Sequence, residues 1–180
     1  MSTEQTNTRL ITKQVPPNMR DRYTERVKKA TFGESKSSGN EMITLECEII
    51  NPQTLKDGDK EYDLTSLERK YYLSLSNKVS EKTGGSPREK TNKVLELLGF
   101  EPVEKGTKPS EEMMKKLNDR FCFDAIINSS EKVLQRKNEK GEYVPITDSR
   151  GQPIKRGFEL TTNPDDILYR VDEPENAPKF

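Results

Sequence analysis

The residues of this sequence with the clearest chemical potential are cations placed among aromatic rings. Arg22, Arg26 and Lys28 fall on one face of an early alternating segment, and Lys70 and Tyr72 share a face of a later one. A further group lies late in the chain: Arg136, Lys137, Lys140, Tyr143, Lys155 and Arg156. Cations that follow a phosphate backbone, interleaved with rings on which bases stack, form the general platform for single-stranded nucleic acid. A basic strand face is, alternatively, a common solvated surface.

Residues for acid–base or metal chemistry are scarce in comparison. The chain has no histidine, which removes the commonest general base and most catalytic zinc sites. The segment "GGSPREKT" resembles a phosphate-binding loop, but Glu89 stands where that motif requires its second glycine. Acid pairs such as Asp57/Asp59 and Asp165/Asp166 are interpreted as solvated loop charge. We therefore expect a protein without catalytic residues, cofactor or metal.

Charge is distributed unevenly along the 180 residues, although the formal net charge is zero. Residues 1–36 hold eight basic and four acidic side chains, a net charge of +4. Residues 165–180 hold two basic and five acidic side chains, a net charge of −3. Local positive charge is what a phosphate backbone responds to, because screening limits the interaction to about 10 Å. The distribution therefore permits nucleic-acid binding that the total charge does not suggest.

Composition and hydropathy predict a cytoplasmic protein with a small core. Hydrophobic residues make up 29% of the chain and charged residues 34%, so we expect polar loops and disordered ends around the core. No apolar run is long enough for a membrane span, and the N-terminus lacks the apolar centre of a signal peptide. Cys47 and Cys122 lie in strand-like apolar contexts and are expected to be buried, reduced thiols.

Three alternating segments come first in the chain. The segment "MRDRYTERVKKATFGE" alternates imperfectly, because Ala30 and Phe32 fall on its basic face, and a bulge would restore the pattern. After the turn "KSSGNE", the next strand places one row of apolar residues on a single face: Ile43, Leu45, Cys47 and Ile49. The third strand, "LERKYYLSLS", does the same with Leu67, Tyr71, Leu73 and Leu75.

Two helices and two further strands follow. The segment "SPREKTNKVLELLGF" has Ser86 as a cap, proline in its first turn and Gly99 as a stop. A second, shorter helix opens on Ser110, and strands resume at "RFCFDAIINSSEKVLQRK" and "PIKRGFELT". Phe121 and Phe123 are expected in the core, and Phe32 and Phe158 are interpreted as packing residues.

This order predicts a mainly β fold, a five-stranded OB-fold-like barrel with one or two helices inserted between strands 3 and 4. We expect a flexible N-terminal arm over residues 1–18, the barrel over residues 19–163 and a flexible acidic tail over residues 164–180. OB-folds bind oligomers across strands 2 and 3 and with two loops. Here those loops are the 34–41 turn and the 136–157 segment.

Two stretches resemble a known family. The segment "SKSSGNEMITLECEI" resembles the start of bacteriophage single-stranded DNA-binding proteins of the OB-fold type, and "KTNKVLELLGF" resembles the helix that often follows their third strand. The resemblance covers roughly residues 20–130, and its motif carries over to Lys36, Ser38, Gly39, Asn40 and Met42. It implies largely sequence-independent protection of single-stranded DNA during phage DNA replication or recombination, in the host cytoplasm.

The resemblance also bears on the C-terminus. Many single-stranded DNA-binding proteins end in an acidic tail closed by an aromatic residue, and this chain ends "DEPENAPKF". This implies that Asp172, Glu173, Glu175 and Phe180 bind replication or recombination proteins, with an ordinary disordered end as the alternative. The predicted DNA-binding residues are Arg22, Arg26, Lys28, Lys36, Ser38, Asn40, Lys70, Tyr72, Arg136, Lys137, Tyr143, Lys155 and Arg156.

Two other functions are compatible with the same sequence. One is a protein-interaction or virion assembly module on a similar barrel, which the zero net charge favours. The other is a metal-dependent nuclease that uses the scattered acids. The oligomeric state stays open, with a homo-oligomer among the alternatives.

Overall fold

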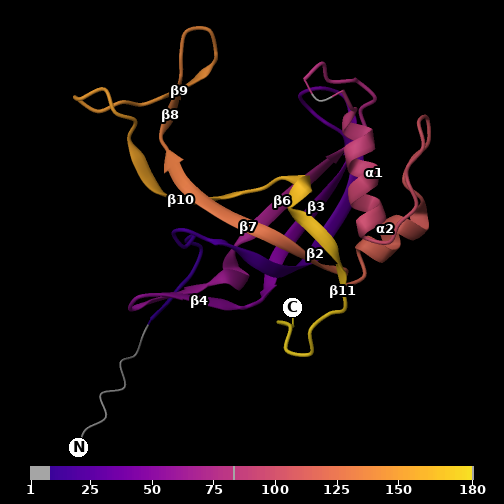
Figure 1. Cartoon of the computed structure of the whole chain (residues 1–180), viewed down its shortest axis with the longest axis horizontal. Coiled ribbons are helices and arrows are strands. Elements are labelled where there is room, and N and C mark those ends of the chain that lie inside the picture. Colours follow the sequence, from indigo (N-terminus) through magenta and orange to yellow (C-terminus); the bar gives the residue numbers. More distant parts are fainter. Residues whose placement is uncertain (1–8, 83, 180) are drawn as a thin grey trace, which may run out of the picture.

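A strongly curved antiparallel sheet forms the body of the protein (Figure 1). The structure, a computed structural model, describes residues 9–82 and 84–179. The sheet has the order β10-β7-β2-β3-β6, and β11 pairs with β7 beside β10. Its strands are β2 (Arg20–Glu34), β3 (Glu41–Asn51), β6 (Glu68–Ser74), β7 (Cys122–Val133), β10 (Lys155–Thr161) and β11 (Ile167–Val171). The OB-fold-like barrel with its helices between the third and fourth barrel strands is confirmed.

The long strand β2 bends so that it joins two parts of the barrel. Its first half pairs with β7, and residues from Thr24 onward pair with β3. The register shifts between Val27 and Lys29, which is the bulge that the sequence pattern required. As a result Val27 and Ala30 both lie in the core, 3% and 6% exposed.

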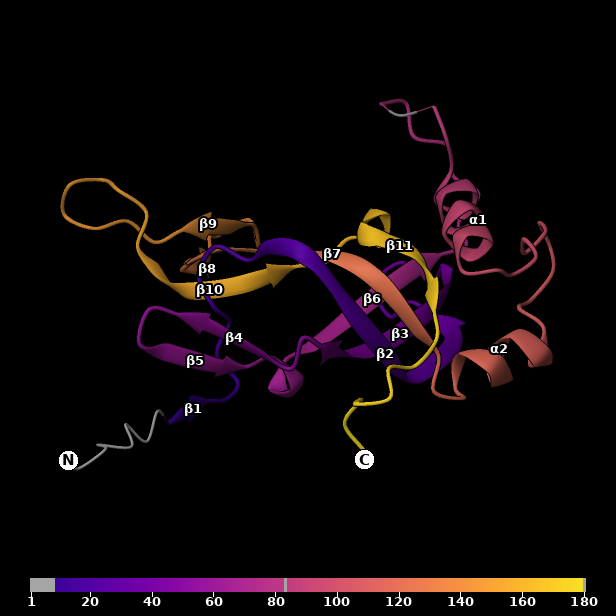
Figure 2. The same cartoon turned by 60° about the horizontal axis from the view of Figure 1, so that its bottom comes forward.

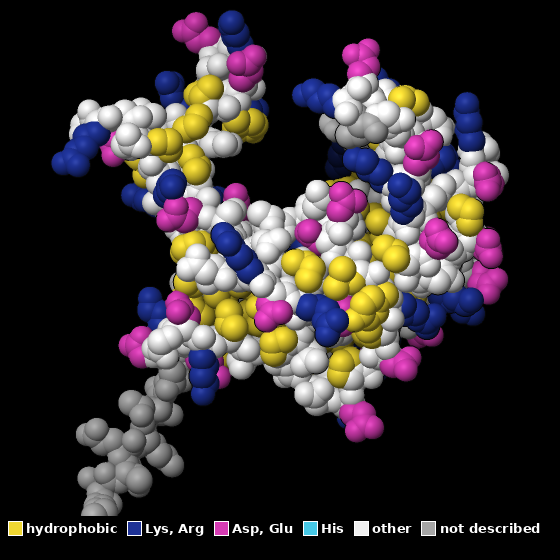
Figure 3. Space-filling model, viewed as in Figure 1, with side chains coloured by type: hydrophobic (Ala, Val, Ile, Leu, Met, Phe, Trp, Pro, Cys, Tyr) yellow, Lys and Arg dark blue, Asp and Glu magenta, His cyan; other side chains and the backbone are white. Residues whose placement is uncertain are grey.

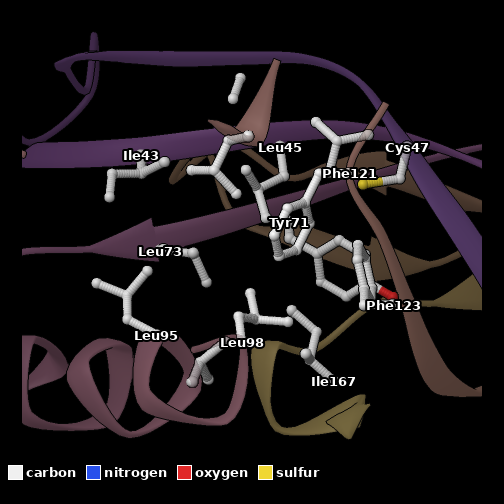
Figure 4. Close-up of a cluster of buried hydrophobic side chains, with 14 of the residues drawn as sticks. Ile43, Leu45, Cys47, Tyr71, Leu73, Leu95, Leu98, Phe121, Phe123 and Ile167 are labelled. Atoms are coloured by element: carbon white, nitrogen blue, oxygen red, sulfur yellow. The ribbon is translucent and has the colours of Figure 1, made fainter. Parts of the chain in front are cut away.

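The two helices between β6 and β7 begin where the sequence predicts. Helix α1 (Pro87–Leu97) opens with a capping box between Ser86 and Glu89, and α2 (Glu111–Leu117) is capped by Ser110. Leu95 and Leu98 point from the α1 region onto the inner face of the sheet, where Tyr71 and Phe123 meet edge to face (Figure 4). Cys47 and Cys122 are buried free thiols, as expected.

A second apolar cluster fills the other end of the barrel. It contains Met19, Tyr23, Ile49 and Tyr62, and it is covered by β1 (Leu10–Ile11) and the hairpin β4 (Thr54–Asp57)–β5 (Lys60–Asp63). Strand β1 pairs in parallel with β5 (Figure 2). Residues 1–8 lie outside the described residues. Residues 9–18 were expected to belong to a flexible arm, but Ile11 and Val15 pack against this cluster.

The C-terminal boundary also differs from the prediction. Residues 164–171, assigned to a flexible tail, form the 3-10 helix Pro164–Asp166 and strand β11, which pairs with β7. Ile167 is 2% exposed in the main core. The burial of this isoleucine holds the segment on the barrel, although the acidic composition around it suggested disorder.

A projecting arm separates β7 from β10. We call residues 134–154 the wing; it contains β8 (Gln135–Lys137) and β9 (Tyr143–Pro145), which pair with each other. A second ladder at its base joins Leu134, Ile146 and Ile154 through backbone hydrogen bonds of 2.8–2.9 Å. The wing therefore has local order of its own, and it stands away from the barrel in Figures 1 and 2.

The seam between β6 and the β10–β11 edge is bridged by one arginine. Arg69 points inward from β6 and donates to Glu25 Oε2 on β2 at 3.1 Å, to the carbonyl of Thr161 at 3.0 Å, and to Asp166 at 3.3 Å. Both side chains of the Arg69–Glu25 pair are 0% exposed, and the Tyr71 hydroxyl also donates to Glu25. The sequence interpretation missed this network, which holds three strands and the 3-10 helix together.

Removing Arg69 should destabilise the barrel strongly. Arg69→Met leaves the Glu25 carboxylate buried without its cation, which typically costs about 3–5 kcal/mol. The matched control is Lys70→Met, because Lys70 is half exposed and its surface pair with Glu46 is worth at most about 1 kcal/mol. Urea unfolding followed by circular dichroism measures both. Equal stabilities of the two variants would contradict the structural role of Arg69.

The buried carboxyl also predicts a pH dependence. Burial raises the pKa of Glu25 from 4.5 to about 7, although Arg69 and Tyr71 lower it in part. Since the folded state binds the proton more tightly, this contribution to stability is complete below pH 4.5 and is lost as pH rises through about 7. Glu25→Gln keeps an acceptor for Arg69 and should flatten the fall in unfolding free energy over that range. Glu46→Gln, on the outer face, should leave the wild-type slope unchanged; a slope retained in Glu25→Gln would show that another group controls it.

Candidate nucleic-acid interface

The turn between β2 and β3 exposes the residues on which the resemblance to phage proteins rests. Ser35 and Asn40 close it through a backbone hydrogen bond of 2.8 Å, and Gly39 adopts a positive φ of 69° that favours glycine. Lys36, Ser38 and Asn40 are all exposed. The turn lies next to the end of β6, because the amide of Leu75 donates to the carbonyl of Glu41.

The outer face of β2, β3 and β6 brings together four of the predicted residues. Tyr72 is 55% exposed and lies opposite Thr44 of β3. The cations beside it are paired with carboxylates: Lys28 with Glu68 at 3.2 Å, Lys70 with Glu46 at 3.3 Å, and Arg26 with Glu48 at 3.1 Å. The face is therefore close to neutral, and an incoming phosphate would compete with these carboxylates.

Arg26 does not occupy the exposed position that its strand pattern predicts. Its side chain is 5% exposed and contacts Glu48, Glu173 at 3.5 Å and the carbonyl of Pro178 at 2.7 Å. Burial raises the pKa of Glu48, and the Arg26 guanidinium opposes that rise. Since the C-terminal segment covers Arg26, the prediction of a surface contact with phosphate is wrong at this position.

Two other predicted cations are exposed but engaged. Arg22 is hydrogen-bonded to the Tyr169 hydroxyl at 2.7 Å and lies 3.6 Å from Asp124. Lys155 pairs with Glu131 at 2.9 Å. These exposed pairs are weak, with a typical worth of about 0–1 kcal/mol, so both side chains can exchange partners.

The wing and its base carry cations that lack such partners. Lys137 Nζ lies 5.3 Å from the centre of the Tyr143 ring, which is itself 65% exposed. Arg136, Arg156 and Lys140 are exposed, and no salt bridge joins them to any described residue. Residues 131–156 hold seven basic and four acidic side chains, a net charge of +3.

A second group of unpaired lysines was missed by the sequence interpretation. Lys78, Lys82 and Lys90 lie in the loop before α1 and in its first turn, and all three are exposed. Within residues 9–82 and 84–179 they form no salt bridge. The repeated lysines of "NKVSEKTGGSPREK" were the available signal, but this loop was considered only as a phosphate-loop candidate.

Figure 3 shows a broad hollow between the wing and these loops. Lys and Arg side chains appear on both of its walls, with some acidic side chains among them. The wing forms one wall, and the 76–86 loop with the start of α1 forms the other (Figure 1). We call these two surfaces the walls, and we count the 34–41 turn with the second wall, because the carbonyl of Glu41 accepts from the amide of Leu75 just before the 76–86 loop.

The acidic residues of the predicted tail differ in whether they contact the barrel or stay exposed. Glu173 is hydrogen-bonded to Arg120 and lies near Arg26, while Asp172 and Glu175 stay exposed. The carbonyl of Asn176 accepts from Gln53 at 2.6 Å. Phe180 lies outside the described residues. The described part of the segment is thus docked on the barrel, and only part of its acidic charge faces outward.

Three further features concern metal ligands, membrane-spanning helices and the Cys122 thiol. No group of three or more Cys, Asp or Glu side chains within residues 9–82 and 84–179 is arranged to hold a metal ion. The described helices are all too short or too polar to cross a membrane. Burial raises the pKa of Cys122 to about 11, so its thiol is protonated at neutral pH.

The sequence matches no protein-family model, and comparison with curated proteins finds no match.

Arg26 and Lys28 provide a test of which cations are structural. Arg26→Ala leaves Glu48 buried without its main partner, a loss of about 3–5 kcal/mol. For a chain of this size that should lower the melting temperature by roughly 10 °C. Lys28→Ala removes only an exposed pair and should shift the melting temperature little. Differential scanning calorimetry measures both variants; equal melting temperatures for the two would contradict the structural role of Arg26.

Proposed function

We propose that this protein binds single-stranded DNA without catalysis and with little dependence on sequence. The proposal extends to protection of the strand in DNA replication or recombination, of the kind implied by the resemblance to phage proteins. The strand would run through the hollow between the walls. Lys36, Lys78 and Lys90 would contact its phosphates from one side, and Arg136 and Lys140 from the other.

The contrast between paired and unpaired cations carries the proposal. On the outer face of β2, β3 and β6 each predicted cation has a carboxylate within 3.3 Å. On the walls, exposed cations have no such partner among the described residues, so a phosphate can approach them without displacing an acid. Counterion release from a backbone held by such cations supplies the main part of nonspecific affinity.

Aromatic side chains supply the second part of the mechanism. Tyr72 and Tyr143 are the most exposed rings among the described residues, at 55% and 65%. A base stacked on such a ring contributes about 1–3 kcal/mol and does so for every base type. Cations along both walls and two exposed rings are the combination that a single strand requires and that a duplex, with its bases enclosed, cannot use.

Fluorescence anisotropy with labelled single- and double-stranded DNA tests the proposal. An oligonucleotide of about 30 nucleotides spans more than the largest footprint of one OB-fold. We expect tight binding of the single strand, weak binding of the duplex, and a steep loss of affinity with salt. Absence of single-strand binding at low salt would contradict the proposal.

The walls can be tested separately from the fold. The triple variant Lys36→Ala, Lys90→Ala, Arg136→Ala should reduce the slope of log K against log salt by about 2, since each phosphate contact contributes roughly 0.7. Lys115→Ala is the matched control, because Lys115 is an exposed lysine on α2 that forms no salt bridge with the described residues. An unchanged slope in the triple variant would place the binding surface elsewhere.

One observation favours a second function. The near-neutral face of paired charges on β2, β3 and β6 is better suited to a protein partner than to a phosphate backbone, because such a face attracts neither sign of charge strongly. A protein-interaction or assembly module would keep the fold and show no affinity for single-stranded DNA. The anisotropy measurement therefore separates the two functions.

A further inference from the structure

A pocket of about 330 Å³ lies beside Tyr72, at the foot of the wall formed by α1 and its preceding loop. Three segments that are distant in sequence meet there: β6, residues 80–91 and residues 163–165. Its size is at the lower end of the range for small-molecule sites, which suits one planar group rather than an extended ligand.

The walls of this pocket are held by hydrogen bonds on both sides. The hydroxyl of Thr91 donates to the carbonyl of Ser74 at 2.6 Å, which fixes α1 against β6. On the other side, Asn163 and Asp166 cap the 3-10 helix reciprocally, and Asp166 also accepts from Arg69. The pocket is therefore preformed, so little ordering opposes the binding of a ligand.

Its surfaces match a nucleobase. Tyr72 offers an exposed ring, and Pro87 and Pro164 add flat apolar surfaces. Lys90 lies at the same pocket and has no carboxylate partner among the described residues, so it can neutralise a phosphate attached to the base. A ring for stacking, with a cation at the edge, is the pattern by which single-stranded bases are held.

The polar side chains of the pocket can distinguish one base from another. The Asn163 oxygen is occupied by the amide of Asp165 at 3.0 Å, which leaves its NH₂ group as a donor. The Asp165 carboxylate has no hydrogen bond to another described side chain, and it can only accept. A donor beside a two-oxygen acceptor complements a base edge that shows one oxygen and two adjacent N–H groups, which among the DNA bases is guanine.

We propose that this pocket holds one guanine base of the bound strand, stacked on Tyr72, with Asn163 donating to its oxygen and Asp165 accepting from its two N–H groups. The proposal rests on the proposed single-strand binding and adds to it a local preference for sequence. A flipped-out base in a single strand exposes this edge, whereas pairing conceals it in a duplex.

Anisotropy with thymine oligonucleotides of about 12 nucleotides, within the footprint of one OB-fold, tests the preference. A single central thymine is replaced by guanine, adenine or cytosine. We expect guanine to bind about tenfold more tightly than the other three, the size typical of one bidentate base contact. Asp165→Asn should abolish the preference, so that the four oligonucleotides bind with about equal affinity. Tyr72→Ala should weaken all four.

Equal affinity for the four oligonucleotides, or a guanine preference that survives Asp165→Asn, would overturn the pocket assignment while single-strand binding stands. Whether the pocket binds a base when the protein does not bind strands is tested separately. This test adds the mononucleotides 5′-GMP and 5′-AMP to isotope-labelled full-length protein. If the protein fails to bind strands but 5′-GMP alone shifts the NMR signals of Tyr72 and residues 163–165, the pocket stands and the proposed function fails. If neither strands nor 5′-GMP bind, both proposals fail.

Discussion

The buried pair of Arg69 and Glu25 is the constraint on which the rest of this structure depends. Two charges without solvent exposure are costly to bury, and hydrogen bonds to their other polar atoms offset part of that cost, although Glu25 Oε1 and Arg69 Nε have no partner among the described residues. Here Arg69 reaches the Thr161 carbonyl and Asp166, and Tyr71 donates to Glu25. The pair also fixes register, since a shift of β6 by one residue would turn Arg69 outward and leave Glu25 in an apolar core.

The buried pair of Arg69 and Glu25 also explains why the candidate pocket has a defined shape. Strands β6 and β10 face each other across the seam of the barrel, and side chains join them there. Arg69 spans the seam at one end, and α1 packs beside it at the other. Asp166 belongs to both systems: it accepts from Arg69 in the core and from the amide of Asn163 at the surface. The position of Asn163 and Asp165 is therefore tied to the ion pair inside the barrel. Core and surface are coupled through one carboxylate.

Alternation and capping signals were sufficient to predict most of the fold. Ile43, Leu45 and Cys47 reveal β3 by their alternation alone, and Ser86 and Ser110 mark both helix starts.

The errors have a common cause: at each of these positions, contacts between residues distant in sequence determine the structure. Arg69 and Glu25 each stand in an inward row of their strand, but parity cannot say that the two rows meet. Arg26 follows a surface pattern until residues 173–178 cover it, and Ile167 holds a segment whose local composition is that of a tail. The candidate site was predicted in part: the wing and the 35–40 turn were identified, whereas the lysines before α1 gain meaning only when the fold places them across the hollow.

The placement of the acids explains how a chain with zero net charge can still present positively charged surfaces. Carboxylates on β3 and β6 neutralise the cations of the barrel face, so the field outside that face is weak. The wall cations project on loops and on the wing, and they have no carboxylate partner among the described residues. They therefore attract a phosphate over a Debye length of about 10 Å. A strand approaching such a protein would be attracted to the hollow more than to the flat face, and it would meet that face at Tyr72, which lines the pocket at the foot of one wall. The placement of the acids, more than the number of the bases, would then decide where the strand binds.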